Sequence, residues 1–368
     1  MYMSYAERKK LFEEFSTVRK RPMITYVTSI RPNLSVNMSS DSITKIIDII
    51  GHIPPEVKDI DFMIISNGGD PITSLRIISI LRERFEHITV IVPYVAYSAA
   101  TILALGADDI MMHPFSNLGP VDPQLTIAKT NMIGQNSDLH FSSEDIRNYI
   151  EFLKEDIGIT DQAHLAAALS NLTAEVGAIP IGNAKRSQQL SLSLSKRMLE
   201  THLNDVTSAS NIAQKLNSSF YHHGYAVSRK EAQEIGLNIT IPTKSEEKII
   251  WSIWQDYSKE MKADKEFNLL NELMNDPLSK EKLDTVPILN LPANTPPDIA
   301  NQLIINAASQ TQISTRTSIE FEVLLATIES IYISYEMKNN ISVTYWRNAD
   351  MTLGFNSIPY SDGWKERN

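Results

Sequence analysis

The sequence predicts an α/β protein in which a mostly parallel sheet is covered by helices, with a β-rich accessory region at the C-terminus. Short apolar strands alternate with amphipathic helices over residues 60–113, and such crossovers require parallel strands. Residues 318–346 instead alternate apolar and polar side chains, which is typical of antiparallel strands. The chain has 368 residues, 42% of them hydrophobic, which is enough for more than one ordinary core.

The first part of the chain contains the elements expected in the parallel sheet. Asp70 is a suitable N-cap and Pro71 suits the first helical position, so we expect a helix directly after the turn at 67–69. The other expected helices are 7–15, 41–50 and 98–105, and the expected strands are 23–27, 60–66, 88–92 and 109–113.

The stretch from Ile88 to Ala107 has 20 residues without a charge, long enough in principle to span a bilayer. Pro93 interrupts this stretch. The residues before it are β-branched, whereas those near its end are rich in Ala and Leu. We therefore expect a strand, a turn and a helix here, and no membrane span.

The second part of the chain is expected to be helical and then β-rich. A long amphipathic helix from Ser245 carries Trp251 and Trp254 on one face, which suits a core or a subunit interface. The other expected helices are 143–156, 160–176, 182–203 and 229–236, with a brief strand through Ile239. The expected C-terminal strands are 318–323, 330–335 and 342–346, with Asn339 and Asn340 between the last two.

These changes in sequence character predict three parts. They are a first domain at 1–244, a helical segment and Pro-containing linker at 245–296, and the β-rich accessory domain at 297–368.

Composition excludes several classes of protein. The 34 Lys and Arg against 44 Asp and Glu give a net charge of −10, which disfavours a nucleic-acid binder. The absence of cysteine excludes disulfides, thiolate nucleophiles and iron–sulfur clusters. Without a Walker motif, a dinucleotide fingerprint or metal-spaced His and Glu residues, no cofactor or metal is expected. The first residues lack the apolar stretch of a signal peptide, so we expect a cytoplasmic enzyme.

The first candidate site is the turn Ser66-Asn67-Gly68-Gly69-Asp70, which follows a predicted strand and precedes a helix. Paired glycines let backbone N–H groups approach a substrate closely, as an oxyanion hole requires. Ligands in open α/β sheets bind at such strand ends. An ordinary strand-to-helix turn is the structural alternative.

The second candidate site is the turn Ala96-Tyr97-Ser98-Ala99-Ala100-Thr101, where the next strand gives way to a helix. A serine at such a turn can present its hydroxyl as a nucleophile, and the N–H of Ala99 can join the oxyanion hole. The structural alternative is that Ser98 only caps the helix.

In this order, the two turns and the segment after them resemble the serine peptidases of the Clp-protease and signal-peptide-peptidase (SppA) class. The resemblance is greatest to the serine dehydrogenase proteinase family, over about residues 20–240, and that name implies no redox chemistry. The residues that match the family motifs are Gly68, Gly69, Asp70, Ala96, Ser98, Ala99, Thr101 and the whole of Leu118–Gln124. The departures are Ser66, Asn67, Tyr97 and Ala100.

The resemblance implies a ClpP/crotonase-like β-β-α superhelix with Ser98 as its nucleophile. Gly68, Gly69 and the Ala99 amide become the candidates for the oxyanion hole. Ala100 stands where the family has glycine and adds a methyl group close to the nucleophile.

The general base has more than one candidate. The segment around Lys185 resembles the helix from which SppA-like enzymes supply a lysine, and burial would lower the pKa of its amine. A solvated lysine beside Arg186 is an equal alternative. Clp-type enzymes use a histidine, for which His223 is the matching position, although a backbone contact at a turn is the preferred explanation of this residue. Asp122 is a candidate to orient a base or only to fix a turn.

The preferred function is therefore a cofactor-independent serine endopeptidase, with a Ser–Lys dyad or a Ser–His variant. The resemblance supplies the word peptidase, and it implies peptide or protein substrates, a homo-oligomer and a possible regulatory partner at the C-terminal region. Two alternatives stay open: a catalytically weak or inactive assembly protein of the same fold, and a crotonase-like acyl-transfer enzyme.

Overall fold

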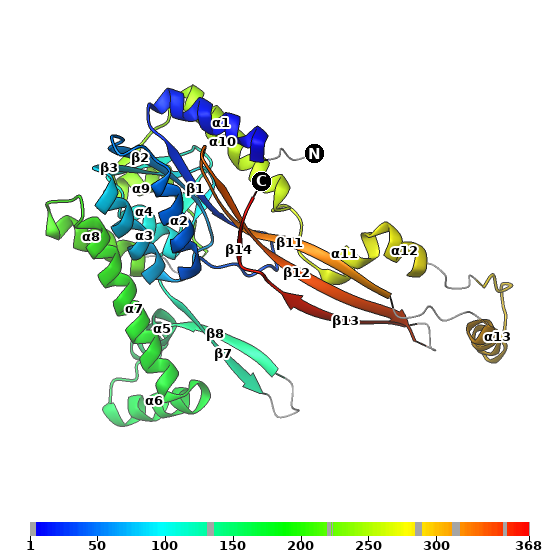
Figure 1. The fold of residues 1–368 in the computed structure, drawn as a ribbon. Helices are drawn as coiled ribbons and strands as arrows, with labels where there is room; N and C mark the ends of the chain where they lie inside the picture. The colour runs from blue at the N-terminus through cyan, green and yellow to red at the C-terminus, as the bar shows by residue number, and fades with distance from the viewer. Residues whose placement is uncertain are drawn as a thin grey trace.

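A mixed sheet runs through the whole protein (Figure 1). The computed structural model describes residues 5–130, 136–218, 222, 224–283, 289–310, 317–348 and 352–367. Within these residues, nine strands form the sheet in the order β10-β5-β3-β2-β1-β11-β12-β13, with β14 also pairing β12. The strands are β1 (Met23–Thr28), β2 (Asp59–Ile65), β3 (His87–Val92), β5 (Asp109–Met112), β10 (Ile239–Thr240), β11 (Thr317–Glu329), β12 (Ser334–Arg347), β13 (Leu353–Tyr360) and β14 (Trp364–Glu366).

The half of the sheet from β10 to β1 is parallel, as the sequence predicts. Its strands bury side chains on both faces, which explains their continuous apolar character. Phe62 and Ile64 of β2 belong to one apolar core, whereas Met63 and Ile65 belong to the core on the opposite face.

Helices cover both faces of this parallel half. The first core includes residues of α2 (Ile43–Gly51), α3 (Pro71–Arg84), α4 (Ala99–Leu105), α7 (Ala178–Leu199), α8 (Val206–Ser218) and α9 (Arg229–Ile235). The second core contains α1 (Tyr5–Arg19) and α10 (Lys244–Glu260). A mixed α/β architecture is thereby confirmed.

The remaining elements lie outside these layers. A small sheet contains β4 (Val95–Ala96), β6 (Asn117–Leu118) and β9 (Val227–Ser228). The antiparallel pair of β7 (Gln124–Thr130) and β8 (Asn136–Ser142) projects from the body, near α5 (Ser143–Glu151) and α6 (Gln162–Val176) (Figure 1). Three helices precede the C-terminal strands in the chain: α11 (Leu269–Asn275), α12 (Pro277–Leu283) and α13 (Pro297–Gln310) (Figure 1).

The C-terminal β-rich region joins the central sheet, because β11 pairs antiparallel with β1. Thr25 lies opposite Glu329, and the N–H of Ser29 donates to the carbonyl of Leu325 at 2.7 Å. The expected boundary near residue 297 therefore does not separate two sheets. Beyond this contact, β11, β12 and β13 continue as a long arm (Figure 1).

Three expectations about local structure are wrong. The turn between β11 and β12 lies at 330–333, where the N–H of Ser330 donates to the carbonyl of Ile333, so the expected strand at 330–335 is mostly a turn. Asn339 and Asn340 lie inside β12, paired with β11, because cross-strand pairing overrides their turn preference. Residues 297–310, which are expected to open the β-rich domain, instead form α13, which begins at Pro297 with Asp298 in its first turn. Residues 284–288, within the expected helical segment and linker at 245–296, lie outside the described residues.

No single helix in the described ranges is both long enough and apolar enough to cross a membrane. The pair α6 and α7 meets the length and composition limits only when taken together, and the two are bent by 94° at their junction. The uncharged stretch at 88–107 contains β3, β4 and α4, as expected from its sequence.

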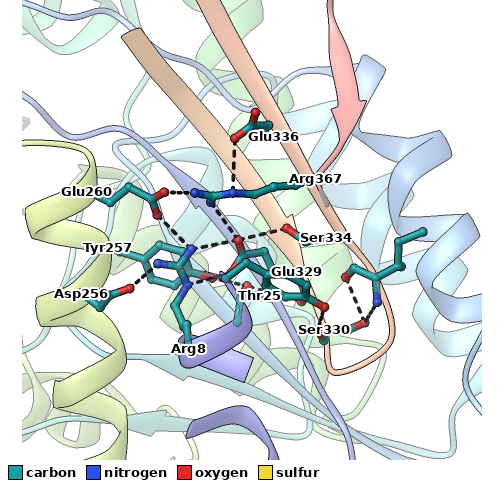
Figure 2. A network of polar contacts seen from close by, with 12 residues as sticks. Arg8, Thr25, Asp256, Tyr257, Glu260, Glu329, Ser330, Ser334, Glu336 and Arg367 are labelled. Atoms are coloured by element: carbon teal, nitrogen blue, oxygen red, sulfur yellow. Dashed lines mark hydrogen bonds and ion pairs between the residues drawn. The ribbon is translucent and has the colours of Figure 1, made fainter. Parts of the chain in front are cut away.

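A buried ionic network fastens α1, α10 and the C-terminal strands together (Figure 2). The guanidinium of Arg8 is fully buried and pairs with both carboxylate oxygens of Glu329, at 2.8 and 2.9 Å. It also pairs with Asp256 and Glu260 of α10. The hydroxyl of Tyr257 donates to Glu329 at 2.7 Å. These bonds fix the β11–β12 turn against both helices.

The carboxylate of Glu329 is the centre of this network. Burial by itself would raise the pKa of Glu329, but the attraction and hydrogen bonds of Arg8, with those of Tyr257, outweigh it and hold the pKa below its usual range. Its ion pairs therefore stabilise the fold above the pKa of an unfolded glutamate, and this stabilisation is lost as the pH falls through the lower folded pKa.

Replacing Arg8 with methionine should lower the free energy of unfolding by about 3–5 kcal/mol, because it removes the guanidinium that pairs with three buried carboxylates. Urea unfolding at neutral pH measures the loss, which should shrink at acid pH as Glu329 becomes protonated. The matched control is Lys58→Met, which breaks the exposed pair with Glu86 and should cost less than about 1 kcal/mol. Equal losses in the two variants would contradict this account.

Candidate active site

The glycine turn after β2 is held by a neighbouring backbone segment. Gly68 and Gly69 have φ values of +113° and +145°, which side chains rarely adopt. A Cβ on Gly69 would lie 2.4 Å from the backbone of Met38, so no larger residue fits there. The N–H of Met38 donates to the carbonyl of Gly68 at 2.8 Å, and Asp70 N–H donates to Met38 at 2.9 Å. The turn is therefore fixed on both sides.

Helix α3 begins as the sequence predicts. The carboxylate of Asp70 accepts hydrogen bonds from the N–H groups of Ile72 and Thr73, at 3.0 and 3.2 Å, and Pro71 is the first helical residue. These bonds use the side chain of Asp70 to cap the helix.

Ser98 has a positive φ of +52°, with ψ −117°, between β4 and α4. Such a conformation is costly for serine and persists only where its surroundings impose it. Its side chain makes no capping hydrogen bond to α4, and it has no hydrogen-bond partner among the described residues. The interpretation of Ser98 as a simple helix cap is therefore wrong, and its hydroxyl is available for chemistry.

Three neighbouring contacts impose this backbone at Ser98. The N–H of Tyr97 donates to the carbonyl of Ser66 at 3.0 Å, which joins the two turns. Thr101 donates from its hydroxyl to the carbonyls of Ala96 and Gly119, at 2.7 and 2.9 Å. A Cβ on Gly68 would lie 2.8 Å from Cβ of Ser98, so the two turns are in close contact.

Two backbone N–H groups beside Ser98 are unpaired within the described part of the chain, those of Gly69 and Ala99. The N–H of Gly68, by contrast, donates to Oγ of Ser66 at 3.0 Å. Gly68 is buried, whereas Gly69 is partly accessible. Of the three predicted oxyanion donors, Gly69 and Ala99 thus have free N–H groups, and Gly68 instead shapes the turn.

Ser98 and Gly69 line an open cleft of about 300 Å³. The cleft also contains Asp70 and serines from α7, and its apolar lining comes from Pro71, Ile102, Val121, Pro123, Leu125 and Leu190. A cleft with a nucleophile, unpaired N–H donors and an apolar wall can hold a carbonyl group beside an uncharged side chain.

Lys185 lies outside this cleft in the single chain. Ser187, Leu190 and Ser191 of α7 face Ser98, whereas Lys185 is exposed on another side of the helix. Its amine donates to Oε1 of Gln188 at 3.2 Å, and it lines a separate cleft with Ile146 and Ile181. Side chains two positions apart on an α-helix point about 200° apart around the helix axis, which explains why Lys185 and Ser187 line different clefts.

Asp122, the other predicted site residue that the structure describes, lines a different cleft from Ser98. Asp122 is buried, accepts a hydrogen bond from Nε2 of Gln124 at 3.1 Å, and lines a polar cleft with His140 and His222. His223 lies outside the described residues. No Lys or His is among the described residues that line the Ser98 cleft. Within those ranges, no three His, Cys, Asp or Glu side chains are grouped to hold a metal.

His113, which follows β5, belongs to an aromatic cluster. Its ring stacks on Trp251 at 4.7 Å, and Nδ1 accepts a hydrogen bond from the N–H of Phe115 at 3.2 Å. Burial lowers the pKa of His113, which favours the neutral ring. Trp254 stacks on Tyr94 at 4.6 Å and is buried, so these tryptophans contribute to packing.

Sequence reasoning missed the hydroxyl pair behind the glycine turn. Thr28 donates to Oγ of Ser66 at 2.8 Å, and that oxygen accepts from Gly68 N–H. The signal was the hydroxyl residue just before Asn67. The cleft-lining residues of β7 and α7 carry no local signal, because only the fold brings Leu125 and Leu190 beside Ser98.

Comparison with known proteins agrees with the motifs. Residues 9–140 match the sequence model of the ClpP-like SDH-type serine proteinase family, which supports the family resemblance of the two turns and the segment after them. Two uncharacterized proteins of Methanocaldococcus jannaschii are also similar. One is 40% identical over 73 residues, 20% of this chain and 25% of that protein. The other is 33% identical over 126 residues, 32% and 43% respectively. The chain thus spans less than half the length of either relative.

Among solved structures, a mutant of the 1510-N membrane-bound stomatin-specific protease is similar to this chain. The two are 15% identical, and the match covers 60% of this chain and 81% of the protease with a TM-score of 0.36. That score is too low to define a shared fold.

Replacing Gly68 with alanine should lower the free energy of unfolding by about 1–3 kcal/mol, because φ +113° and the contact with Ser98 both oppose a Cβ. It should also slow labelling of Ser98 by a small fluorophosphonate. The matched control is Gly51→Ala, where a Cβ would meet nothing within 4 Å, and which should change neither property. Normal stability and labelling in Gly68→Ala would contradict this account of the turn.

Proposed function

We propose that the protein is a cofactor-independent serine endopeptidase with Ser98 as its nucleophile. The observation that carries the proposal is the positive-φ backbone of Ser98, which leaves its hydroxyl without a capping bond to α4, beside the N–H groups of Gly69 and Ala99. The match of residues 9–140 to a serine proteinase family supports it.

The reaction follows from these groups. Oγ of Ser98 attacks the carbonyl carbon of a peptide bond while a base accepts the hydroxyl proton, and the former carbonyl oxygen becomes negatively charged. The N–H groups of Gly69 and Ala99 stabilise that charge. The C–N bond then breaks, the proton passes to the leaving amine, and water hydrolyses the acyl-enzyme to release the acid and free Ser98.

Lys185 is the proposed base, acting from a neighbouring subunit, because within one chain its amine lies outside the Ser98 cleft. A lysine accepts a proton only when its pKa is lowered, and burial at a subunit contact would lower it. His223 is the alternative base, with Asp122 as its orienting group.

The wider proposal follows the family resemblance. The parallel half of the sheet and its helices are taken as a ClpP/crotonase-like superhelix of the SppA-like type, in a cytoplasmic homo-oligomer that acts on peptide or protein substrates. The C-terminal region is then an accessory part that gates access or binds a regulatory protein.

One observation favours a second function, a catalytically weak or inactive assembly protein of the same fold. No Lys or His lines the Ser98 cleft in the described part of one chain. A crotonase-like acyl transferase would also use paired N–H groups, but it has no need for a reactive Ser98, so a serine-directed label separates it from the peptidase.

A fluorophosphonate should label the full-length protein at Ser98, as mapped by mass spectrometry. Ser98→Ala should abolish the label and lower peptide turnover by at least about 10³-fold, because the nucleophile is lost. The matched control is Ser79→Ala, an exposed serine on α3, which should retain both. Wild-type turnover in Ser98→Ala would show that another residue is the nucleophile.

Lys185→Ala should abolish peptide turnover, whereas His223→Ala should only weaken it, because the lysine is the proposed proton acceptor. Steady-state kinetics of the assembled protein measure both, with Lys154→Ala as the control for loss of an exposed lysine. Full activity in Lys185→Ala would remove that residue from the mechanism.

A further inference from the structure

The outer edge of the C-terminal arm is an open strand. In the described part of the chain, β13 pairs with β12 on one side and with no strand on the other (Figure 1). The opposite edge of the sheet is β10, which has two residues, whereas β13 has eight. An exposed edge of this length presents a row of backbone groups ready to pair with another strand.

The direction of these backbone groups follows from Pro359. Ile341 lies opposite Pro359, and proline has no N–H, so this position cannot exchange two hydrogen bonds with β12. Along an antiparallel pair, residues that bond to the partner strand alternate with residues whose N–H and C=O groups point away from it. The N–H groups of Leu353, Phe355 and Ser357 therefore point toward the open edge, since these residues alternate in step with Pro359. Three donors and their carbonyls are therefore free to pair over most of β13.

The side chains of β13 do not protect this edge. Residues 353–360 contain no charge, and Phe355, Ile358 and Tyr360 are 43%, 61% and 46% exposed. Natural sheets usually protect long edges with charges, prolines or bulges. Here Pro359 blocks pairing only near one end of the strand.

We propose that β13 pairs antiparallel with β13 of a second copy of this chain, about a two-fold axis at Ser357. Directly opposite residues lie on the same face of a sheet, and side chains along a strand alternate between its faces. When β13 pairs with β13 of a second copy, the residue numbers of each opposite pair must therefore differ by an even number. Centring on Ser357 sets Phe355 opposite Pro359 and Gly354 opposite Tyr360 of the other copy. Centring on Asn356 would set Phe355 opposite Ser357, with less apolar contact.

The packing of the arm supports this register. The face of β12 that carries Ile341, Val343 and Tyr345 is buried in an apolar cluster. Phe355 lies opposite Tyr345 and shares that face, so its contact with Pro359 of the second copy extends the cluster across the edge. On the other face, Tyr360 meets Gly354, where the indole of Trp346 lies 2.5 Å from the place that a Cβ would take, so Tyr360 meets that indole.

Charge favours a second copy over a different protein. The chain carries a net charge of −10, so two copies repel each other overall. A contact through the uncharged β13 edge adds nothing to this repulsion. The same edge has no charged side chain that would select an oppositely charged protein as its partner. The proposal concerns assembly alone and does not depend on peptidase activity.

The absence of cysteine makes a single-cysteine test direct. Two Ser357 residues face each other in the proposed register at a Cα separation of about 5.5 Å, within disulfide range, whereas two Asn356 residues lie diagonally, about 7–8 Å apart between Cα atoms. Under mild oxidation of the full chain, Ser357→Cys should therefore give at least about fivefold more cross-linked dimer than Asn356→Cys on a non-reducing gel. Equal cross-linking, or more in Asn356→Cys, would overturn the register.

Sedimentation velocity across a concentration series tests the pairing itself. The wild type should associate, and Ile358→Lys should raise its dissociation constant by about tenfold or more, because it sets charges at the edge. Ser357→Pro, which removes an outward N–H, should act in the same direction. Ile241→Lys is the matched control, since Ile241 is 58% exposed elsewhere, and should associate as the wild type does. A monomeric wild type, or unchanged association in both β13 variants, would overturn the proposal.

Discussion

The strained, positive-φ backbone at Ser98 is the constraint on which the candidate site depends. It places a hydroxyl at the start of α4 without using it as a cap, and it leaves the N–H of Ala99 free. The close contact with Gly68 and the bond from Tyr97 to Ser66 hold this conformation. Because the strained residue is also the candidate nucleophile, the energy of holding it there is consistent with a catalytic role rather than with packing alone.

The Arg8 network connects parts of the fold that are distant in sequence. It joins the first helix, α10 and the turn between β11 and β12, three segments that are far apart in sequence (Figure 2). Through β1, which pairs with both β2 and β11, the C-terminal arm shares a sheet with the strand that leads to the glycine turn. The arm and the candidate site are thus parts of one framework, so a rearrangement of the arm would act on β1 directly.

Local sequence patterns predict the parallel strands, the capped helix after Asp70 and both turns, because each depends on neighbouring residues. They do not predict the pairing of β11 with β1, since either edge of the sheet could accept a strand and the choice depends on buried contacts such as that of Arg8 with Glu329. They also mislead at Asn339 and Asn340, whose turn preference is outweighed by pairing within a long hairpin. For the same reason, the position of Lys185 relative to Ser98 follows from the rotation of α7, which no local signal fixes.

The most direct test of the central claim is a crystal structure of the protein after reaction with a phosphonate, whose phosphonyl oxygen takes the place of the oxyanion. We expect the phosphorus on Oγ of Ser98 and its oxygen within hydrogen-bond distance of the N–H groups of both Gly69 and Ala99. An adduct on Ser98 whose oxygen points away from both N–H groups, or an adduct on a different residue, would contradict the proposed site.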